Sequence, residues 1–173
     1  MTVALRPELP ADQAAIRLVN RAAFGGDAEA RIVDQVRGTD RWIEGGSIVA
    51  TTPSGEVVGH LLLSEGDLRA ADGSVRRIWL LGPVAVLPAR QGRGVGSALM
   101  RAAIELAVER RQPLIALLGH ADYYPRFGFE PARAIGLEPP AAWPDDHWLA
   151  LRLPGWTPEL SGRVGYPPAF GVG

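Results

Sequence analysis

The stretch Gln91-Gly92-Arg93-Gly94-Val95-Gly96 decides the fold, because it joins two segments with different periodicities. Upstream, residues 77–86 are apolar from Ile78 onward without clean alternation, which is typical of a strand covered on both faces. Downstream, apolar residues recur at helical spacing over about residues 94–111, and Pro113 ends that helix. The wholly apolar run 114–118 predicts a second strand. A strand, a helix and a strand in this order predict a right-handed parallel βαβ crossover.

The glycine-rich turn inside this crossover is a candidate anion site. Unpaired backbone N–H groups and the helix dipole converge where the helix begins, and glycine lets the backbone approach a phosphate closely. The Rossmann pattern G-x-G-x-x-G does not match, because Ser97 stands at its third glycine and the motif lies in mid-chain. A Walker-type loop is excluded because the chain has no Lys. Taken alone, the turn is also consistent with a tight strand-to-helix connection.

The segments on either side complete a mixed α/β pattern. Helical spacing predicts helices from Pro10 to the pair Gly25-Gly26 and from Asp27 to about Gly38. Residues 47–52 and 56–64 are rich in β-formers around a turn and predict a hairpin. We expect a short helix at 123–127, a late strand at 148–153 and a wrapped tail over 154–173.

Length and composition limit the class of protein. The 173 residues suit one domain over 1–173, with 47% hydrophobic residues available for a core. A formal net charge of −1 argues against a dedicated nucleic-acid or anionic-membrane binder. No apolar run approaches the roughly 20 residues of a membrane span, and the first ten residues lack a signal segment, so we expect a cytoplasmic protein. The absence of Cys excludes disulfides, thiolate metal sites and a cysteine-linked intermediate.

Three segments together resemble the GCN5-related N-acetyltransferase (GNAT) family. Gln91–Gly96 is similar to its coenzyme A signature Q/R-x-x-G-x-G/A, Leu81–Pro88 to its central strand, and Tyr124–Phe129 to its Y-x-x-x-G-F ending. The segments stand in the family's order, and the resemblance covers residues 3–153. The tail residues 165–170 resemble an uncharacterised bacterial subgroup of predicted small N-acetyltransferases.

The resemblance implies an α+β fold, with a central, mixed but mostly antiparallel sheet that contains the parallel crossover and is flanked by helices. It implies acetyl-CoA as cosubstrate, with the pantetheine arm lying in a gap between the central strand and residues 114–118. The acetyl group would pass to an amine by direct attack in a ternary complex. The coenzyme contacts that it implies are Val84, Ala85, Val86, Gln91, Gly92, Arg93, Gly94, Val95, Gly96 and Ser97.

The resemblance also implies a catalytic acid. The family's tyrosine falls on Tyr124, whose phenol would protonate the departing thiolate, and a backbone N–H of Val84 or Ala85 would stabilise the oxyanion. The alternative for Tyr124 is a packed aromatic residue. Its neighbour Tyr123 is the competitor, as a packing residue or a coenzyme contact.

The general base is left open. Many family members carry a Glu on the central strand, whereas residues 78–86 of this chain are all non-ionisable. His60, Glu65, His120 and Asp122 could each serve directly or through water, and each could equally be a hydrogen-bonded structural residue.

The remaining expectations concern ligands and partners. His147 beside Asp145 and Asp146 lacks a second spaced ligand, so we expect no metal site. Trp42, Trp143 and Trp156 could line an acceptor pocket or belong to the core. The acceptor would be a small-molecule amine or a protein N-terminus, without nucleic acid or membrane, and a homodimer is compatible with the pattern. The alternative function is a noncatalytic acyl-CoA sensor.

Overall fold

The computed structural model describes residues 2–172, and its elements fall into two parts. The first part holds the described residues of Met1–Leu63 together with Gly82–Glu105, and the second holds those of Ser64–Leu81 and Leu106–Gly173. The two long strands β3 (Val57–Arg69) and β4 (Val75–Val86) each contribute residues to both parts.

In the first part, two helices follow a short edge strand. β1 (Ala4–Pro7) leads through the 3-10 turn η1 (Pro10–Asp12) to α1 (Gln13–Phe24), α2 (Ala28–Val36) and β2 (Trp42–Thr51). β1 pairs antiparallel with β2, and the strand order here is β1-β2-β3-β4. The predicted helices are confirmed, while β1 was not predicted and β2 begins five residues earlier than expected.

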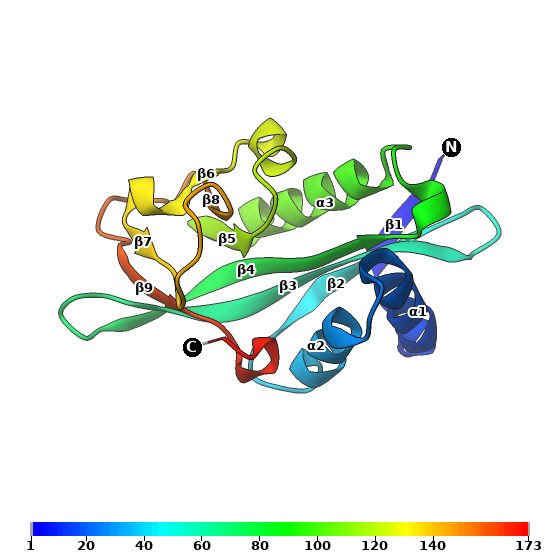
Figure 1. Cartoon of the computed structure of the whole chain (residues 1–173), viewed down its shortest axis with the longest axis horizontal. Helices are drawn as coiled ribbons and strands as arrows, with labels where there is room; N and C mark the ends of the chain where they lie inside the picture. The colour runs from blue at the N-terminus through cyan, green and yellow to red at the C-terminus, as the bar shows by residue number, and fades with distance from the viewer. Residues whose placement is uncertain (1, 173) are drawn as a thin grey trace. The chain divides into compact units, whose positions relative to one another are not determined.

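The helices of this part lie on opposite faces of its strands (Figure 1). A Cβ added at Gly59 on β3 would lie 2.9 Å from Val95 and 3.0 Å from Leu99, both on α3 (Val95–Glu109). The next residue, His60, instead contacts Asn20 of α1. Because successive strand residues point to opposite faces, α3 and α1 cover different sides of β3.

The apolar face of α3 differs from the one that its sequence suggests. Spacing from Val95 and Leu99 would continue through Ala102 and Leu106, but these two are only half-buried, and the fully buried residues further along are Met100, Ala103 and Ala107. The sequence 95, 99, 103, 107 is an i, i+4 row of small and branched side chains. Such a row allows the helix to approach the sheet closely.

In the second part, β3 and β4 form a hairpin that closes with a hydrogen bond from the Ala70 amide to the Ser74 carbonyl (2.9 Å). β5 (Leu114–Leu118) pairs parallel with β4, with Trp79 opposite Ile115, which confirms the predicted parallel crossover. β8 (Trp148–Arg152) then pairs antiparallel with β5, and β6 (Glu130–Pro131) pairs with β8. The strands therefore form a mixed, mostly antiparallel sheet, as expected.

The C-terminal tail, which we expected to be a wrapped segment, contains a strand. β9 (Gly162–Gly165) pairs antiparallel with β3, placing Asp67 opposite Gly165, and β7 (Leu137–Glu138) pairs parallel with β9. β9 begins and ends with a glycine, which has a low β-propensity, so propensity alone does not predict this strand. Three further 3-10 turns complete the part after β5, at η3 (Tyr124–Phe127), η4 (Ala132–Ile135) and η5 (Pro168–Phe170).

Trp148 anchors the core of the second part. Its side chain is fully buried, and its indole N–H donates to the carbonyl of Leu137 at 2.8 Å. Apolar residues from both long strands, β5, β7, β8, β9 and the connecting segments form a cluster with it: Leu68, Ile78, Leu80, Leu114, Ala116, Ala132, Leu137, Ala150, Leu160 and Val164. The cluster includes Leu114 and Ala116 and so holds β5 in the second part.

Candidate functional site

The glycine-rich turn leads directly into α3 and has the conformation of an open cradle. Gly92 and Gly94 have φ values of 69° and 83°, in the left-handed region that favours glycine. A Cβ at either position would meet no atom within 4 Å, so the space above the turn is empty of protein. The first helical bond runs from the Ala98 amide to the Gly94 carbonyl (2.9 Å), and the preceding amides belong to the unpaired first turn.

The end of β4 adjoins this cradle. Ala85 is buried, whereas the flanking Val84 and Val86 are half-buried, as expected from alternation along a strand. The Gln91 side chain donates to the Val86 carbonyl at 3.1 Å and so ties the turn back to the strand. The first part of the structure thus contains, as one continuous segment, every residue expected to contact coenzyme A: Val84, Ala85, Val86, Gln91, Gly92, Arg93, Gly94, Val95, Gly96 and Ser97.

Tyr124 belongs to the second part, at the start of η3 and next to the end of β5. Its ring covers Gly119 so closely that a Cβ there would collide with it. The rings of Tyr123 and Phe129 meet it edge to face, at centroid distances of 5.1 Å and 5.9 Å. Burial, with a smaller effect of Tyr123, raises the pKa of Tyr124 to about 12. The phenol is therefore protonated at neutral pH and can only donate a proton.

His60 lies in a buried hydrogen-bonded chain. Its Nδ1 is 3.1 Å from the Asn20 side-chain nitrogen, which also donates to the Ile16 carbonyl, and its Nε2 is 2.9 Å from the Ser47 hydroxyl. Because an amide nitrogen only donates, Nδ1 accepts and Nε2–H donates to Ser47. Ser47 in turn donates to the Glu8 carboxylate.

These contacts assign His60 a structural role. Both ring nitrogens are engaged and the residue has no exposed surface. Burial, and then the positive charge of Arg37, lowers the pKa of His60 to about 3, so the ring stays neutral at physiological pH. A neutral imidazole without an open nitrogen is not placed to take a proton from an acceptor.

The other candidate bases lie in the second part, in surface settings. Glu65 faces Arg77 at 3.9 Å between the carboxylate and Nε. The exposed His120 ring is 6.0 Å from the ring of His147. Asp122 accepts at its backbone carbonyl from Arg126 (3.1 Å).

The acidic residues near His147 have close polar partners. Asp146 is 2.8 Å from His147 Nδ1, and Asp145 is 2.6 Å from a guanidinium nitrogen of Arg133. Over residues 2–172, no three metal-ligating side chains gather in a way that could hold an ion. In the same range, no helix is both long enough and apolar enough to cross a membrane.

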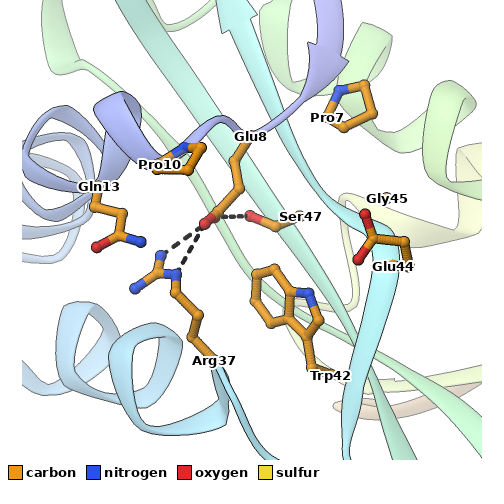
Figure 2. Close-up of a pocket in the computed structure, with 9 residues that line it drawn as sticks. All are labelled: Pro7, Glu8, Pro10, Gln13, Arg37, Trp42, Glu44, Gly45 and Ser47. Carbon is orange, nitrogen blue, oxygen red and sulfur yellow. Dashed lines mark hydrogen bonds and ion pairs between the residues drawn. The ribbon is translucent and has the colours of Figure 1, made fainter.

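Of the three tryptophans considered for an acceptor pocket, Trp42 lines a pocket in the first part of the structure. Trp143 and Trp156 pack instead against the core around Trp148. The pocket has a volume of about 210 Å³ and lies within the first part (Figure 2). Its lining consists of Pro7, Glu8, Pro10, Gln13, Arg37, Trp42, Glu44, Gly45 and Ser47.

Glu8 is one of the charged pocket residues that sequence reasoning missed. Its side chain is only 8% exposed, and it accepts from Arg37 Nε at 2.8 Å and from a terminal Arg37 nitrogen at 3.2 Å. These partners lie 29 and 39 positions away in the sequence, at Arg37 and Ser47. Glu8 also follows a strand of four residues with no alternating pattern, so no local signal marks it.

Comparisons with known proteins agree on one family. Residues 44–131 match the model of the acetyltransferase (GNAT) domain. The uncharacterized N-acetyltransferase YjhQ of Escherichia coli K12 is 34% identical over 157 residues, which are 88% of this chain and 86% of that protein. YhbS of the same strain, also described as an uncharacterized N-acetyltransferase, is 31% identical over 81% of this chain and 80% of its own length.

Solved structures extend the likeness to the whole fold. The crystal structure of Escherichia coli YhbS in complex with CoA superposes with a TM-score of 0.87, at 27% identity, over 98% of this chain and 92% of that one. A GNAT family acetyltransferase from Brucella melitensis, in complex with acetyl-CoA, has a TM-score of 0.79 and 32% identity, with 98% of both chains covered.

Proposed function

Because this chain belongs to the GNAT family of acetyltransferases, we propose that it moves an acetyl group from acetyl-CoA to an amine of its acceptor by direct attack in a ternary complex. The observation that carries this proposal is the open cradle. Two glycines with positive φ stand immediately before a 15-residue helix, and they leave free space over unpaired amides. The solved relatives with CoA and acetyl-CoA support the same ligand.

The residues of the cradle fit a diphosphate. The amides that begin α3 and the dipole of that helix favour a negative charge, and glycine backbone permits a close approach. Arg93 adds an exposed cation to the turn. Residues 91–97 would hold the pyrophosphate, while the backbone of Val84 and Val86 would hydrogen-bond the pantetheine arm in the manner of an added strand.

Each chemical step has a candidate group on this chain. Acetyl-CoA supplies a thioester whose carbonyl is open to an uncharged amine. The N–H of Val84 or Ala85 would stabilise the oxyanion that the attack creates. Tyr124 would then donate its proton to the thiolate that leaves. With His60 engaged on both nitrogens, the acceptor would arrive as the neutral amine, and the proton that its nitrogen loses after the attack would leave through water or restore the phenol of Tyr124.

A binding and turnover experiment tests this function. Titration calorimetry with acetyl-CoA should register binding, and release of free CoA thiol should follow on addition of a suitable amine from a panel of small amines and peptides with free N-termini. Binding of acetyl-CoA with no turnover across the panel would favour the noncatalytic sensor. Absence of heat with acetyl-CoA and CoA at millimolar concentration would refute the proposal.

A further inference from the structure

Tyr166, in the C-terminal tail, has a phenol for which the proposed reaction has no use so far. The residue follows β9 directly, and its ring packs against the core of the second part, 6.3 Å from the ring of Trp148. The rings of Trp143 and Phe170 meet it edge to face, at centroid distances of 5.5 Å and 5.0 Å. These aromatic contacts hold the ring of Tyr166 in place and so determine where its hydroxyl lies.

The hydroxyl of Tyr166 is buried and unpaired. Its oxygen has no hydrogen-bond partner among residues 2–172. Buried polar groups nearly always have partners, because an unpaired one costs free energy. A phenylalanine would fill the same space without that cost. The O–H of Tyr166 is therefore free to donate to an acceptor that forms during a reaction.

The sheet places this hydroxyl at the end of β5. Leu118 stands opposite Trp148 in the antiparallel pairing of β5 with β8. At the next pair, the Gly119 amide donates to the His147 carbonyl at 2.9 Å. Because hydrogen-bonded and non-bonded pairs alternate, the backbone groups of Leu118 point away from β8. Burial raises the pKa of Tyr166, and the nearby Leu118 amide partly opposes this rise without completing a hydrogen bond.

Tyr124 reaches the same stretch of β5 from another segment of the second part. Its ring covers Gly119, the residue after Leu118. A charge on Tyr124 also raises the pKa of Tyr166, so the two phenols lie within electrostatic range of each other. When Tyr124 loses its proton, Tyr166 consequently holds its own proton more tightly and remains a hydrogen-bond donor.

Proton donation by Tyr124 requires a stabilised phenolate. Burial, with a smaller effect of Tyr123, raises the pKa of Tyr124 to about 12, whereas a thiol such as that of cysteine has a pKa of roughly 8.5. Transfer of the phenol proton to a thiolate is therefore unfavourable unless a neighbouring group stabilises the oxygen that the proton leaves.

We propose that Tyr166 is a positioning residue for Tyr124, an inference that rests on the proposed function. As the C–N bond forms and the C–S bond breaks, Tyr124 gives its proton to the departing thiolate and its oxygen becomes negative. The free O–H of Tyr166 turns toward this charge and stabilises it, and Tyr166 keeps its own proton throughout. A proton released by the acetylated nitrogen then restores the phenol of Tyr124.

The interaction can be measured in the free protein, without catalysis. 3,5-Difluorotyrosine incorporated at position 124 has a more acidic phenol, and its ¹⁹F resonance reports the ionisation. Tyr166→Phe should raise the pKa of this phenol by about 1, a tenfold change in the ionisation constant, because a donor to the charged form is lost. Tyr123→Phe is the matched control and should not raise it, since Tyr123 acts in the opposite direction. An unchanged pKa in Tyr166→Phe would overturn the proposal.

Turnover separates this role from a structural one. Where acetyl-CoA drives turnover, Tyr166→Phe should lower kcat about tenfold and leave KM for acetyl-CoA unchanged. Its Tm should stay the same or rise slightly, because the hydroxyl that is removed has no protein partner. A lower Tm with undiminished kcat would assign Tyr166 to the core alone and overturn the proposal. A raised pKa at position 124 in a protein that acetylates no amine of the panel would retain the interaction between the phenols and reject the proposed function.

Discussion

The imidazole of His60 illustrates how neighbouring residues decide what a titratable group can do. As one of only three histidines it is a natural candidate for a base, and its position in the sequence does not exclude that role. The structure supplies Asn20 from α1 and Ser47 from β2, which occupy both nitrogens. Neither partner is near His60 in sequence, so the local sequence pattern could not predict these two hydrogen bonds.

Stability should depend on pH through this residue. The pKa of His60 is lowered to about 3 in the folded protein, whereas an unfolded histidine titrates near 6.5. Between these values the unfolded chain binds one proton more, so the free energy of unfolding should fall by about 1.4 kcal/mol per pH unit as pH drops below 6.5. Urea unfolding at pH 7, 6 and 5 measures this slope, and His60→Gln should flatten it.

Two comparisons isolate the effect. The pKa values of Asp12 and Asp34 are lowered from 3.8, for Asp12 mainly by its hydrogen bond from Arg6 and for Asp34 by hydrogen bonds from Arg17 and Arg37 that overcome burial. The stabilisation from these carboxylates is lost as pH falls below about that value, which is lower than the measured range of pH 5 to 7. His120→Gln, at an exposed ring, should keep the wild-type slope. Parallel curves for His60→Gln and wild type would contradict the prediction.

Tyr124 leads to a catalytic prediction at the same scale. Tyr124→Phe removes the proton donor but keeps the ring that packs on Gly119. We expect kcat to fall about 100-fold or more, the usual range for loss of a general acid, with little change in the dissociation constant of acetyl-CoA. Tyr123→Phe is the matched control and should keep most of the activity. A fully active Tyr124→Phe enzyme would assign this residue to packing alone.

Among the elements, those with a strong hydrophobic pattern could be predicted from the sequence. Strands that form only by pairing with a distant strand could not. β5 spans Leu114–Leu118 as expected, because five consecutive apolar residues before a turn leave little choice. β1 and β9 were missed, since each has four residues and gains its hydrogen bonds from a distant strand. The cradle could be predicted because its signal is local. Closely spaced glycines directly before a helix indicate the backbone conformation without any distant partner.

The cradle allows a prediction with a matched pair of variants. Gly94 has φ of 83°, so any side chain there strains the backbone by about 1–2 kcal/mol. Gly94→Ala and Gly94→Glu share this strain, and the surrounding space is open to both. Only the glutamate places a negative charge over the turn. Calorimetry should show acetyl-CoA binding within a few-fold of wild type for alanine and none for glutamate; similar affinities would argue against a diphosphate here.

For the whole molecule, the family could be recognised from three short segments, while the pocket beside Trp42 could not be predicted. The segments at 81–88, 91–96 and 124–129 carry most of the resemblance, and the solved relatives confirm the fold that it implied. The pocket gathers β1, α1, α2 and β2, and its Glu8 and Ser47 are 39 positions apart. A single amino-acid sequence does not show which of its distant residues contact one another.

Ligand binding should be visible as added stability of the folded chain. A ligand at 100 times its dissociation constant stabilises by about 2.7 kcal/mol, and for a domain of this size each kcal/mol raises Tm by about 2–4 °C. Acetyl-CoA should therefore raise Tm by about 5–10 °C. ATP and NAD at the same concentration should give clearly smaller shifts, and an equal shift from either would indicate a general nucleotide site.

The pairing of β9 with β3 has a consequence for biosynthesis. Residues 67–69 receive their hydrogen-bonding partner from residues 163–165, nearly a hundred positions later. During translation, residues 67–69 leave the ribosome long before residues 163–165 are synthesised. Throughout that interval the nascent polypeptide carries a bare β edge, which is the kind of surface that chaperones shield and that stalled or truncated translation products would leave permanently open to aggregation.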